Sequence, residues 1–391
     1  MDTASLEADL EFLKESGLHR QLRTFASASA PEAVLDGKRI LLFSSNNYLG
    51  LSTHPKVVEA ARKALLQFGT GAGASRLISG NLSLYTELEA RLARLKQTEA
   101  AVVFSSGYAA NVGILSALLG RADRIFLDRL DHASLIDGAR LSGAWMRSYP
   151  HGNLPYLETV LRREKTTGTK LIATDGIFSM DGDISPLPEL LTIARRNGAS
   201  ILLDDAHATG VLGKSGRGSC EFFGIQDDAI IQMGTLSKAL GGLGGFVCGS
   251  RALAESLINH ARSLIYSTAL PPSVLGAALG ALEVIETEPE WRSRLWKNVS
   301  RLRQELSSMG YDLMGSQTHI LPVLLKESDD AVRFSKALLE EGVYVPAIRP
   351  PTVPKGGARL RLSVMATHTE SQIAKALEAF QKVGRELGIC S

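Results

Sequence analysis

Short apolar runs alternate with helical patterns along the first 285 residues or so of the chain. Runs rich in apolar and β-branched residues predict strands at 39–45, 100–106, 124–128, 170–176, 200–207, 229–234 and 244–250. Segments of helical periodicity separate several of them, such as 82–96, in which leucines recur at three- and four-residue spacing. Strands that alternate with helices form parallel sheets with both faces covered, and such strands are apolar almost throughout. The pattern therefore predicts an α/β domain built on a large, mostly parallel sheet.

After about residue 285 the pattern changes. Charged helical segments at 289–309, 328–341 and 369–387 alternate with the apolar runs "HILPVLL", "VYVPAIRP" and "ARLRLSV". This arrangement is typical of a smaller α+β domain. The predicted organisation is an N-terminal arm over residues 1–45, a large α/β domain over 46–285 and a small C-terminal domain over 286–391.

Composition narrows the class of protein. The chain has 391 residues and a formal net charge of +2, which argues against nucleic acid as its main partner. Its 3 cysteines are widely spaced and show no metal-binding or disulfide pattern, so we expect a reducing, cytoplasmic compartment and no metal. The acidic N-terminus lacks the features of a secretion signal. Pro271 and Pro272 interrupt the most apolar stretch, which we interpret as buried chain and not as a membrane span.

Polar side chains gather where four of the predicted strands end. They lie in the segments 105–108, 175–179, 204–207 and 235–238. In parallel α/β sheets, ligands bind beyond the carboxyl ends of the strands. One polar strand end is commonplace, but four together indicate a site.

Lys238 lies in "GTLSKALGGLGG", where glycines, small residues and hydroxyls surround the only charge. A lysine whose amine must be reached by a carbonyl compound suits such a setting, since an amine of lowered pKa forms a Schiff base. We expect the glycines that follow to let the backbone approach a ligand closely. Asp204 ends a buried strand, where a carboxylate needs a partner such as a heterocyclic N–H. Taken alone, each of these residues has an ordinary structural explanation.

A phosphate site is suggested by "FSSGYAAN", in which a strand meets small residues and then a helix start. Ser105, Ser106 and Thr235 add hydroxyl groups, and His132 could stack on a flat aromatic ligand. A phosphate site, a carboxylate facing a ring nitrogen and a Schiff-base lysine together describe a pyridoxal 5'-phosphate site.

A second class of protein is a P-loop nucleoside triphosphatase. The stretch "ATGVLGKS" fits a relaxed form of that motif, with Lys214 as its lysine. However, the glycine-broken "GRGSCEFFG" follows, and no amphipathic helix opens at the lysine. A third class, a non-catalytic protein of this fold, would be expected to lack Lys238 or Asp204.

The motifs jointly resemble those of the α-oxoamine synthases, acyltransferases of pyridoxal-phosphate fold type I. The resemblance covers nearly the whole chain. It rests on "FSSNNYLGL", "FSSGYAAN", "DHASLIDG", "DGIFSMDGDISPLPEL", "DDAHATGVLGKSGRG" and "GTLSKALGGLGGF". The resemblance implies a homodimer with its active sites at the interface, and Thr268 of "YSTALPP" reaching the partner's phosphate group.

The resemblance also implies residue roles. Lys238 carries the cofactor as a Schiff base, Asp204 pairs with the pyridine nitrogen, and His132 stacks on the ring. His207 and Ser179 contact the phenolic oxygen, while Ser106, Gly107, Tyr108 and Thr235 surround the phosphate. Arg361 and Asn46 would bind the amino acid, together with His132. Arg20 and Thr352 would contact the acyl substrate.

The C-terminal segment "AIRPPTVPKGGARLRLSVMATH" discriminates among the substrates of the family. It is most similar to the members that join L-alanine to a pimeloyl thioester, on coenzyme A or a carrier protein, in biotin synthesis. The alternatives within the family are the glycine C-acetyltransferase, 5-aminolevulinate synthase and serine palmitoyltransferase types.

Overall fold

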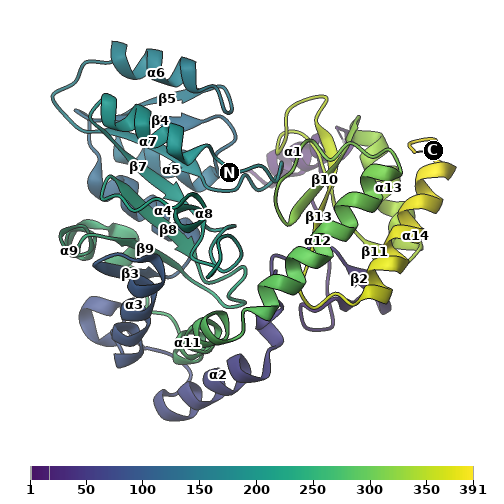
Figure 1. Cartoon of the computed structure of the whole chain (residues 1–391), viewed down its shortest axis with the longest axis horizontal. Coiled ribbons are helices and arrows are strands. Elements are labelled where there is room, and N and C mark those ends of the chain that lie inside the picture. The colour runs from purple at the N-terminus through teal and green to yellow at the C-terminus, as the bar shows by residue number, and fades with distance from the viewer. Residues whose placement is uncertain (1, 17, 391) are drawn as a thin grey trace.

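The computed structural model describes residues 2–16 and 18–390, so residues 1, 17 and 391 of the predicted domains lie outside the described part. Figure 1 shows two lobes, with the large sheet in one and the C-terminal helices in the other. The predicted domain boundaries at 45 and 285 stay a prediction. Among the described residues, no helix is long and apolar enough to cross a membrane.

The large lobe is built on a seven-stranded sheet of order β3-β9-β8-β7-β6-β4-β5. All its neighbouring pairs are parallel except those of β9, which runs antiparallel to β3 and β8. The predicted mostly parallel sheet is therefore confirmed. The strands are β3 (Ala100–Phe104), β4 (Arg124–Asp128), β5 (Trp145–Tyr149), β6 (Lys170–Asp175), β7 (Ala199–Asp204), β8 (Ile230–Thr235) and β9 (Gly245–Gly249).

Helices cover both faces of this sheet. Apolar side chains of α4, α5 and α9 form a core against one face, and those of α6 and α7 form another against the opposite face. These helices are α4 (Gly107–Leu118), α5 (Ala133–Ser142), α6 (Leu154–Arg163), α7 (Leu187–Arg196) and α9 (Arg251–His260). Further helices are α2 (Pro55–Phe68), α3 (Ser83–Lys96), α8 (Ser219–Phe223), α10 (Arg262–Ile265) and α11 (Pro272–Thr287), with short turns at Leu51–Thr53 and Arg76–Gly80.

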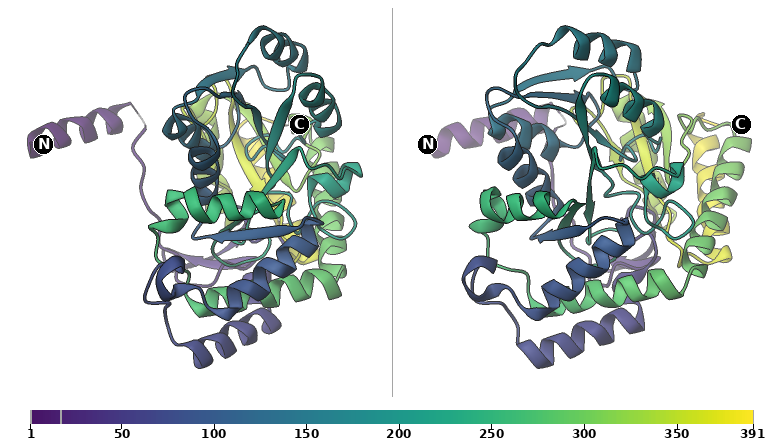
Figure 2. Two further views of the ribbon diagram at one scale, coloured as in Figure 1. Left: turned by 90° about the vertical axis from the view of Figure 1, so that its left-hand side faces the viewer. Right: turned by 60° about the vertical axis from the view of Figure 1, so that its left-hand side comes forward.

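The C-terminal lobe contains an antiparallel sheet of order β10-β13-β12. Its strands are β10 (Ile320–Lys326), β12 (Ala347–Ile348) and β13 (Ala358–Ser363), and every residue of β13 is buried. The helices of this lobe are α12 (Glu290–Ser308), α13 (Ser328–Glu340) and α14 (Glu370–Glu386). Figure 2 shows α1 (Thr3–Glu15), which has no buried residue, projecting from the rest of the molecule.

Three strands differ from the sequence prediction, and one of them, β1 (Glu32–Leu35), matches no predicted strand. The run 39–45 forms β2 (Lys38–Leu42), which lies outside the large sheet and pairs with β1 and β11 (Val343–Tyr344). Strand β5 was not predicted. It is an edge strand with the sequence "WMRSY", whose central residues are exposed, so it lacks the apolar run that marks a strand buried on both faces.

Candidate functional site

The site lies where β6, β7 and β8 end side by side. Asp175 and Asp204 are the last residues of neighbouring parallel strands and pair in register, while Thr235 ends the next strand. Helix α4 begins beside them, directly after β3. Together they enclose a cavity of about 210 Å³, lined by Ser106, Gly107, Tyr108, Asn111, His132, Ser134, Asp175, Asp204, Ala206, His207, Met233, Thr235, Ser237 and Lys238.

The cavity unites much of the predicted site. Eight residues that the sequence analysis named for the cofactor line it: Ser106, Gly107, Tyr108, His132, Asp204, His207, Thr235 and Lys238. It also contains residues to which the sequence gave no role. Asn111 lies one helical turn after Gly107, so a helix beginning at Gly107 could have revealed it. Asp175 belonged to the polar strand ends, but nothing in the sequence paired it with Asp204.

Asp204 is held as a buried hydrogen-bond acceptor. Its Oδ2 accepts from the side-chain amide of Asn111 at 2.7 Å, and its Oδ1 accepts from the backbone N–H of Ala206 at 3.0 Å. Only 5% of Asp204 is exposed. Burial, followed by the nearby Asp204 charge, raises the pKa of Asp175 well above its ordinary value. Asp175 therefore holds its proton to higher pH than an ordinary aspartate does.

The start of α4 offers an anion site at the other end of the cavity. Ser106 is the N-cap, and its hydroxyl accepts from the backbone N–H of Ala109 at 3.0 Å. The N–H groups of Gly107 and Tyr108 donate in none of the described hydrogen bonds and are left for a ligand, which favours negative charge there. The hydroxyls of Thr235 and Ser237 lie 2.7 Å apart on the neighbouring strand end. A Cβ on Gly107 would lie 3.1 Å from Cε of Met233, so a larger residue here would require the Met233 side chain to shift.

A hydrogen-bond network joins Lys238 to the second lobe. Nζ of Lys238 lies 2.9 Å from Nε2 of His207, and Nδ1 of His207 lies 2.7 Å from the Tyr48 hydroxyl. Tyr48 in turn donates to Oδ1 of Asn46 at 3.0 Å, and the guanidinium of Arg361 lies 3.4 Å from the same oxygen. Because the Tyr48 hydroxyl donates its proton to Asn46, it must accept the hydrogen bond from Nδ1 of His207. The other ring nitrogen of the neutral His207, Nε2, then carries no proton and accepts from Lys238.

Burial sets the charge of these groups. It lowers the pKa of Lys238 to about 8, although Asp204 and Asp175 act in the opposite direction. Burial, reinforced by the charges of Lys238 and Arg361, lowers the pKa of His207 well below its usual value. His207 is therefore neutral, and Lys238 changes protonation near neutral pH.

Arg359 and Arg361 lie two residues apart on β13 and have different partners. Arg359 forms an ion pair with Asp181 at 2.7 Å. Arg361 is only 7% exposed and donates to the carbonyl of Ser179, but within residues 2–16 and 18–390 no ion pair of Arg361 occurs. A buried arginine without a carboxylate partner is suited to bind a carboxylate ligand.

Six residues to which the family resemblance gave a role do not line the cavity: Asn46 and Arg361, which belong to the network described above, and Ser179, Thr268, Arg20 and Thr352. Ser179 instead places its carbonyl against Arg361. Thr268 pairs with Ser75 in an isolated β-bridge. Arg20 and Thr352 share a second cavity of about 540 Å³, between the end of α1 and the segment 347–352, which begins with β12. The two residues predicted to contact the acyl substrate are therefore together, but in a separate cavity.

The structure indicates a role for the glycines after Lys238 that differs from the predicted close approach to a ligand. Gly241 has φ of +70°, and a Cβ there would lie 2.4 Å from the backbone nitrogen of Ser52. A Cβ on Gly245 would lie 2.4 Å from the carbonyl of Ser106. These glycines allow neighbouring backbone segments to pack closely around the cavity, and the lining of the cavity does not include them.

The loop around Lys214 does not have the structure of a nucleotide-binding loop. The helix that follows it, α8, begins five residues later, at Ser219. The backbone N–H groups of Ser215 and Arg217, which would face a phosphate, donate to the carboxylate of Glu221 at 3.0 Å. An internal carboxylate therefore occupies the anion position.

Comparison with known proteins identifies the family. The sequence model of aminotransferase class I and II matches residues 38–380. The chain is 51% identical to the 8-amino-7-oxononanoate synthase of Geobacter sulfurreducens, over 99% of this chain and 100% of that protein. It is 48% identical to the 8-amino-7-oxononanoate synthase of Lysinibacillus sphaericus, over 97% and 98% of the two chains.

Comparison with solved structures supports the same family. The serine palmitoyltransferase of Sphingomonas wittichii matches with a TM-score of 0.94 and 36% identity, over 99% of this chain and 98% of that chain. The 8-amino-7-oxononanoate synthase of Francisella tularensis matches with a TM-score of 0.77 and 34% identity, over 89% and 98%. The chain belongs to the aminotransferase class I and II family and has the pyridoxal-phosphate fold type I that the sequence resemblance predicted. Within that family it belongs with the 8-amino-7-oxononanoate synthases.

The residues of the cavity fit pyridoxal 5'-phosphate. An anion site at the start of α4, a buried carboxylate and a lysine amine of lowered pKa all open into one volume. These groups match the phosphate, the ring nitrogen and the aldehyde of the cofactor. The sequence therefore identified the cofactor correctly.

Proposed function

We propose that this chain catalyses the pyridoxal-phosphate-dependent condensation of L-alanine with a pimeloyl thioester to 8-amino-7-oxononanoate, carbon dioxide and a free thiol. A carbon–carbon bond forms between the alanine Cα and the acyl carbon. The thioester C–S bond and the bond from Cα to the carboxylate break. The names of the relatives support this reaction, and its product would enter biotin synthesis.

The observation that carries the proposal is the network from Lys238 to Arg361. It places a basic amine at one end and an arginine without an ion pair at the other, through His207, Tyr48 and Asn46. An α-amino acid presents an acidic Cα–H next to a carboxylate. The network therefore matches the two ends of that substrate.

The residues of the cofactor cavity divide into groups according to the part of the cofactor that each would bind. When bound, pyridoxal phosphate supplies an electron sink for the charge left at the amino acid Cα. The Asp204 carboxylate would keep a proton on the ring nitrogen, and the first turn of α4 with Thr235 and Ser237 would hold the phosphate. Nδ1 of His132 accepts from the backbone N–H of Ser134, which directs the remainder of the ring toward the cavity.

Lys238 moves the proton. Nζ accepts the proton from the substrate Cα and later returns it, a general-base step worth about 10²–10⁴-fold in typical enzymes. A pKa of about 8 makes the neutral amine accessible near physiological pH. His207, neutral and bonded to Tyr48, orients the amine without competing for the proton.

Arg361 and Asn46 bind the alanine carboxylate. The guanidinium offers paired N–H donors, a geometry that suits a planar carboxylate. Its Nη1 also donates to the hydroxyl of Ser363 at 2.7 Å, which fixes the orientation of the side chain. The acyl chain would occupy the second cavity, where Arg20 and Thr352 face apolar side chains of α1 such as Leu10 and Leu13.

We also propose that two copies of the chain form the enzyme. Leu77, Ile78, Tyr108 and Tyr266 are large apolar residues with exposed fractions of 52%, 80%, 49% and 72%. They lie on the turn Arg76–Gly80, on α4 and after α10, segments that pack against each other beside the cofactor cavity. A second copy would bury these residues, and the Thr268 of each copy would reach the phosphate group bound by the other.

Ile78→Asp tests the dimer, because it should shift the chain toward monomers in analytical ultracentrifugation. Monodisperse monomers of the unaltered chain would contradict this proposal.

The function is tested with Lys238→Ala and the exposed-lysine control Lys214→Ala. L-Alanine and pimeloyl-CoA should give product with the unaltered chain and the control, and none with Lys238→Ala. Pimeloyl carrier protein tests the other thioester. Turnover by Lys238→Ala would refute the role of the lysine, and turnover with glycine or serine in place of alanine would assign another member of the family. Loss of activity in Lys214→Ala would revive the nucleotide-binding alternative.

A further inference from the structure

The loop 176–185, after β6, is a compact hairpin that begins at the active site. The backbone N–H of Gly176 donates to the carbonyl of Asp204 at 2.8 Å. Ile177 and Ile184 then pair across the loop, and the N–H of Phe178 donates to the carbonyl of Asp183 at 3.1 Å. The base of the loop is therefore fixed to the strand end that carries Asp204.

The tip of this loop contacts the small lobe. The carbonyls of Ser179 and Met180 accept from Arg361 and Arg359, and the Asp181 carboxylate forms the ion pair with Arg359. The carbonyl of Gly182 accepts from the Thr318 hydroxyl at 2.9 Å. The loop thus connects the cofactor cavity to the strand that carries the carboxylate-binding arginine.

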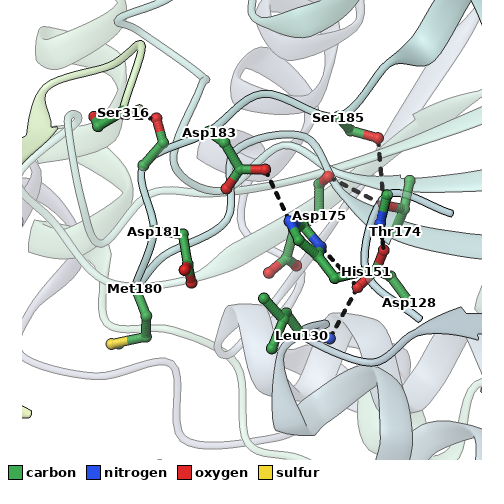
Figure 3. A network of polar contacts seen from close by, with 12 residues as sticks. Asp128, Leu130, His151, Thr174, Asp175, Met180, Asp181, Asp183, Ser185 and Ser316 are labelled. Atoms are coloured by element: carbon green, nitrogen blue, oxygen red, sulfur yellow. Dashed lines mark hydrogen bonds and ion pairs between the residues drawn. The ribbon is translucent and has the colours of Figure 1, made fainter. Parts of the chain in front are cut away.

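His151 holds the loop from the side of the large sheet, as Figure 3 shows. Its Nδ1 lies 3.0 Å from Oδ1 of Asp128, and its Nε2 lies 3.0 Å from Oδ2 of Asp183. The imidazole also packs edge-on against the ring of Phe178, with centroids 4.5 Å apart. The two carboxylates raise the pKa of His151 to about 10, so the ring donates to both of them at neutral pH.

Asp128 gives this contact a rigid base. It ends β4 and is 2% exposed, and its two carboxylate oxygens also accept from the backbone N–H groups of Leu130 and Gly152. Its own N–H donates to Asp131, which in turn accepts from the N–H of Asp175. A movement of Asp183 relative to the sheet therefore requires the loss of a charge-assisted hydrogen bond to His151.

We propose that His151 is a positioning residue for the amino acid substrate: by joining Asp183 to Asp128, it fixes the loop 176–185 and, through the Ser179 carbonyl, the place of Arg361 relative to Lys238. His151 lines neither the cofactor cavity nor the second cavity. The inference rests on the proposed function, since the substrate carboxylate is assigned to Arg361.

The test is His151→Gln in the holoenzyme, with the exposed His260→Gln as the matched control. His260 bonds only to the carbonyl of Ser256 on its own helix among the described contacts. A misplaced arginine should raise the KM for L-alanine by about 10- to 100-fold, because small displacements of a positioning group have effects of that size. The KM for pimeloyl-CoA and the amount of bound cofactor should stay unchanged. Hydrogen exchange should become faster at the amides of Phe178 and Gly182.

Asp183→Asn is the second test variant. It removes the negative charge that His151 contacts on the loop and keeps the size of the side chain. The double variant should raise the KM for L-alanine no more than His151→Gln alone does, because both changes break one contact. Equal KM values in His151→Gln and His260→Gln would overturn the inference, as would additive effects in the double variant. Failure of the unaltered enzyme to use L-alanine would instead refute the proposed function, and the exchange rates of the loop would still report whether His151 fixes it.

Discussion

Nζ of Lys238 lies 2.9 Å from Nε2 of His207, so two basic groups meet inside one cavity. The contact is favourable because burial lowers the pKa of both, leaving a neutral imidazole that accepts and an amine that donates. Two cations at this distance would repel each other. The pair is therefore a hydrogen bond whose strength depends on the protonation of Lys238.

The first prediction concerns pH and stability. In the cofactor-free protein, the folded-state pKa of Lys238 is about 8, against 10.5 in the unfolded chain. Between these values the unfolded chain binds the extra proton, so this group makes the free energy of unfolding rise with pH. Below about pH 8 its destabilising effect is complete. Lys238→Met removes it, so the stability of this variant relative to the unaltered chain should decrease from pH 7 to pH 10.

The size of this effect is about 1–2 kcal/mol, less than the full shift implies because Lys238 is half-buried. Denaturant unfolding of both proteins at pH 7, 8, 9 and 10 measures it. A constant difference across the four pH values would show that the pKa of Lys238 is not lowered.

Asp204→Asn should lower kcat by about 10²–10³-fold, the usual cost of removing one preorganised electrostatic contact. The asparagine keeps an oxygen that can accept from Asn111 but loses the charge that holds a proton on the cofactor ring. The surface substitution Asp312→Asn serves as the control. Steady-state kinetics at saturating cofactor measure the change, and a kcat within twofold of the control would argue against the assigned role.

Arg361→Lys should weaken binding of the amino acid. Lysine keeps the charge but loses the paired donors, and one charge-assisted hydrogen bond is worth about 1.5–3 kcal/mol, or about 10- to 100-fold in KM. The KM for L-alanine should rise by that factor while the KM for pimeloyl-CoA stays near its original value. Arg333→Lys, on the surface, is the control. An increase confined to the thioester would place Arg361 in the acyl site instead.

Lys96→Met should destabilise the fold. Nζ of Lys96 lies 2.6 Å from Oδ2 of Asp205, and both side chains are fully buried. Removing one partner of a buried ion pair leaves the other charge uncompensated, at a cost of about 3–5 kcal/mol. Lys297→Met breaks the exposed pair with Glu370 and should have little effect. Equal melting temperatures of the two variants would refute the importance of the buried pair.

The local pattern determined the large sheet and the strand ends around the cavity. Each buried strand is an apolar run, so the sequence predicted β3, β4, β6, β7, β8 and β9 within a few residues. Parallel strands bring their carboxyl ends to one edge, and this rule alone groups Asp204, Thr235 and Lys238. The sequence did not predict strand β5, because a strand at the exposed edge of the sheet has no apolar run.

The sequence by itself determined which side chains are predicted to carry the chemistry, since Lys238, Asp204 and His207 lie in short motifs whose spacing is local. Only the tertiary structure decided which residues support them. Tyr48 meets His207 across 159 residues, and Arg361 meets Asn46 across 315. No local periodicity encodes such contacts, because they depend on how the two lobes pack. The same packing gave Arg359 an ion pair and left Arg361, two residues away, with none among the described residues.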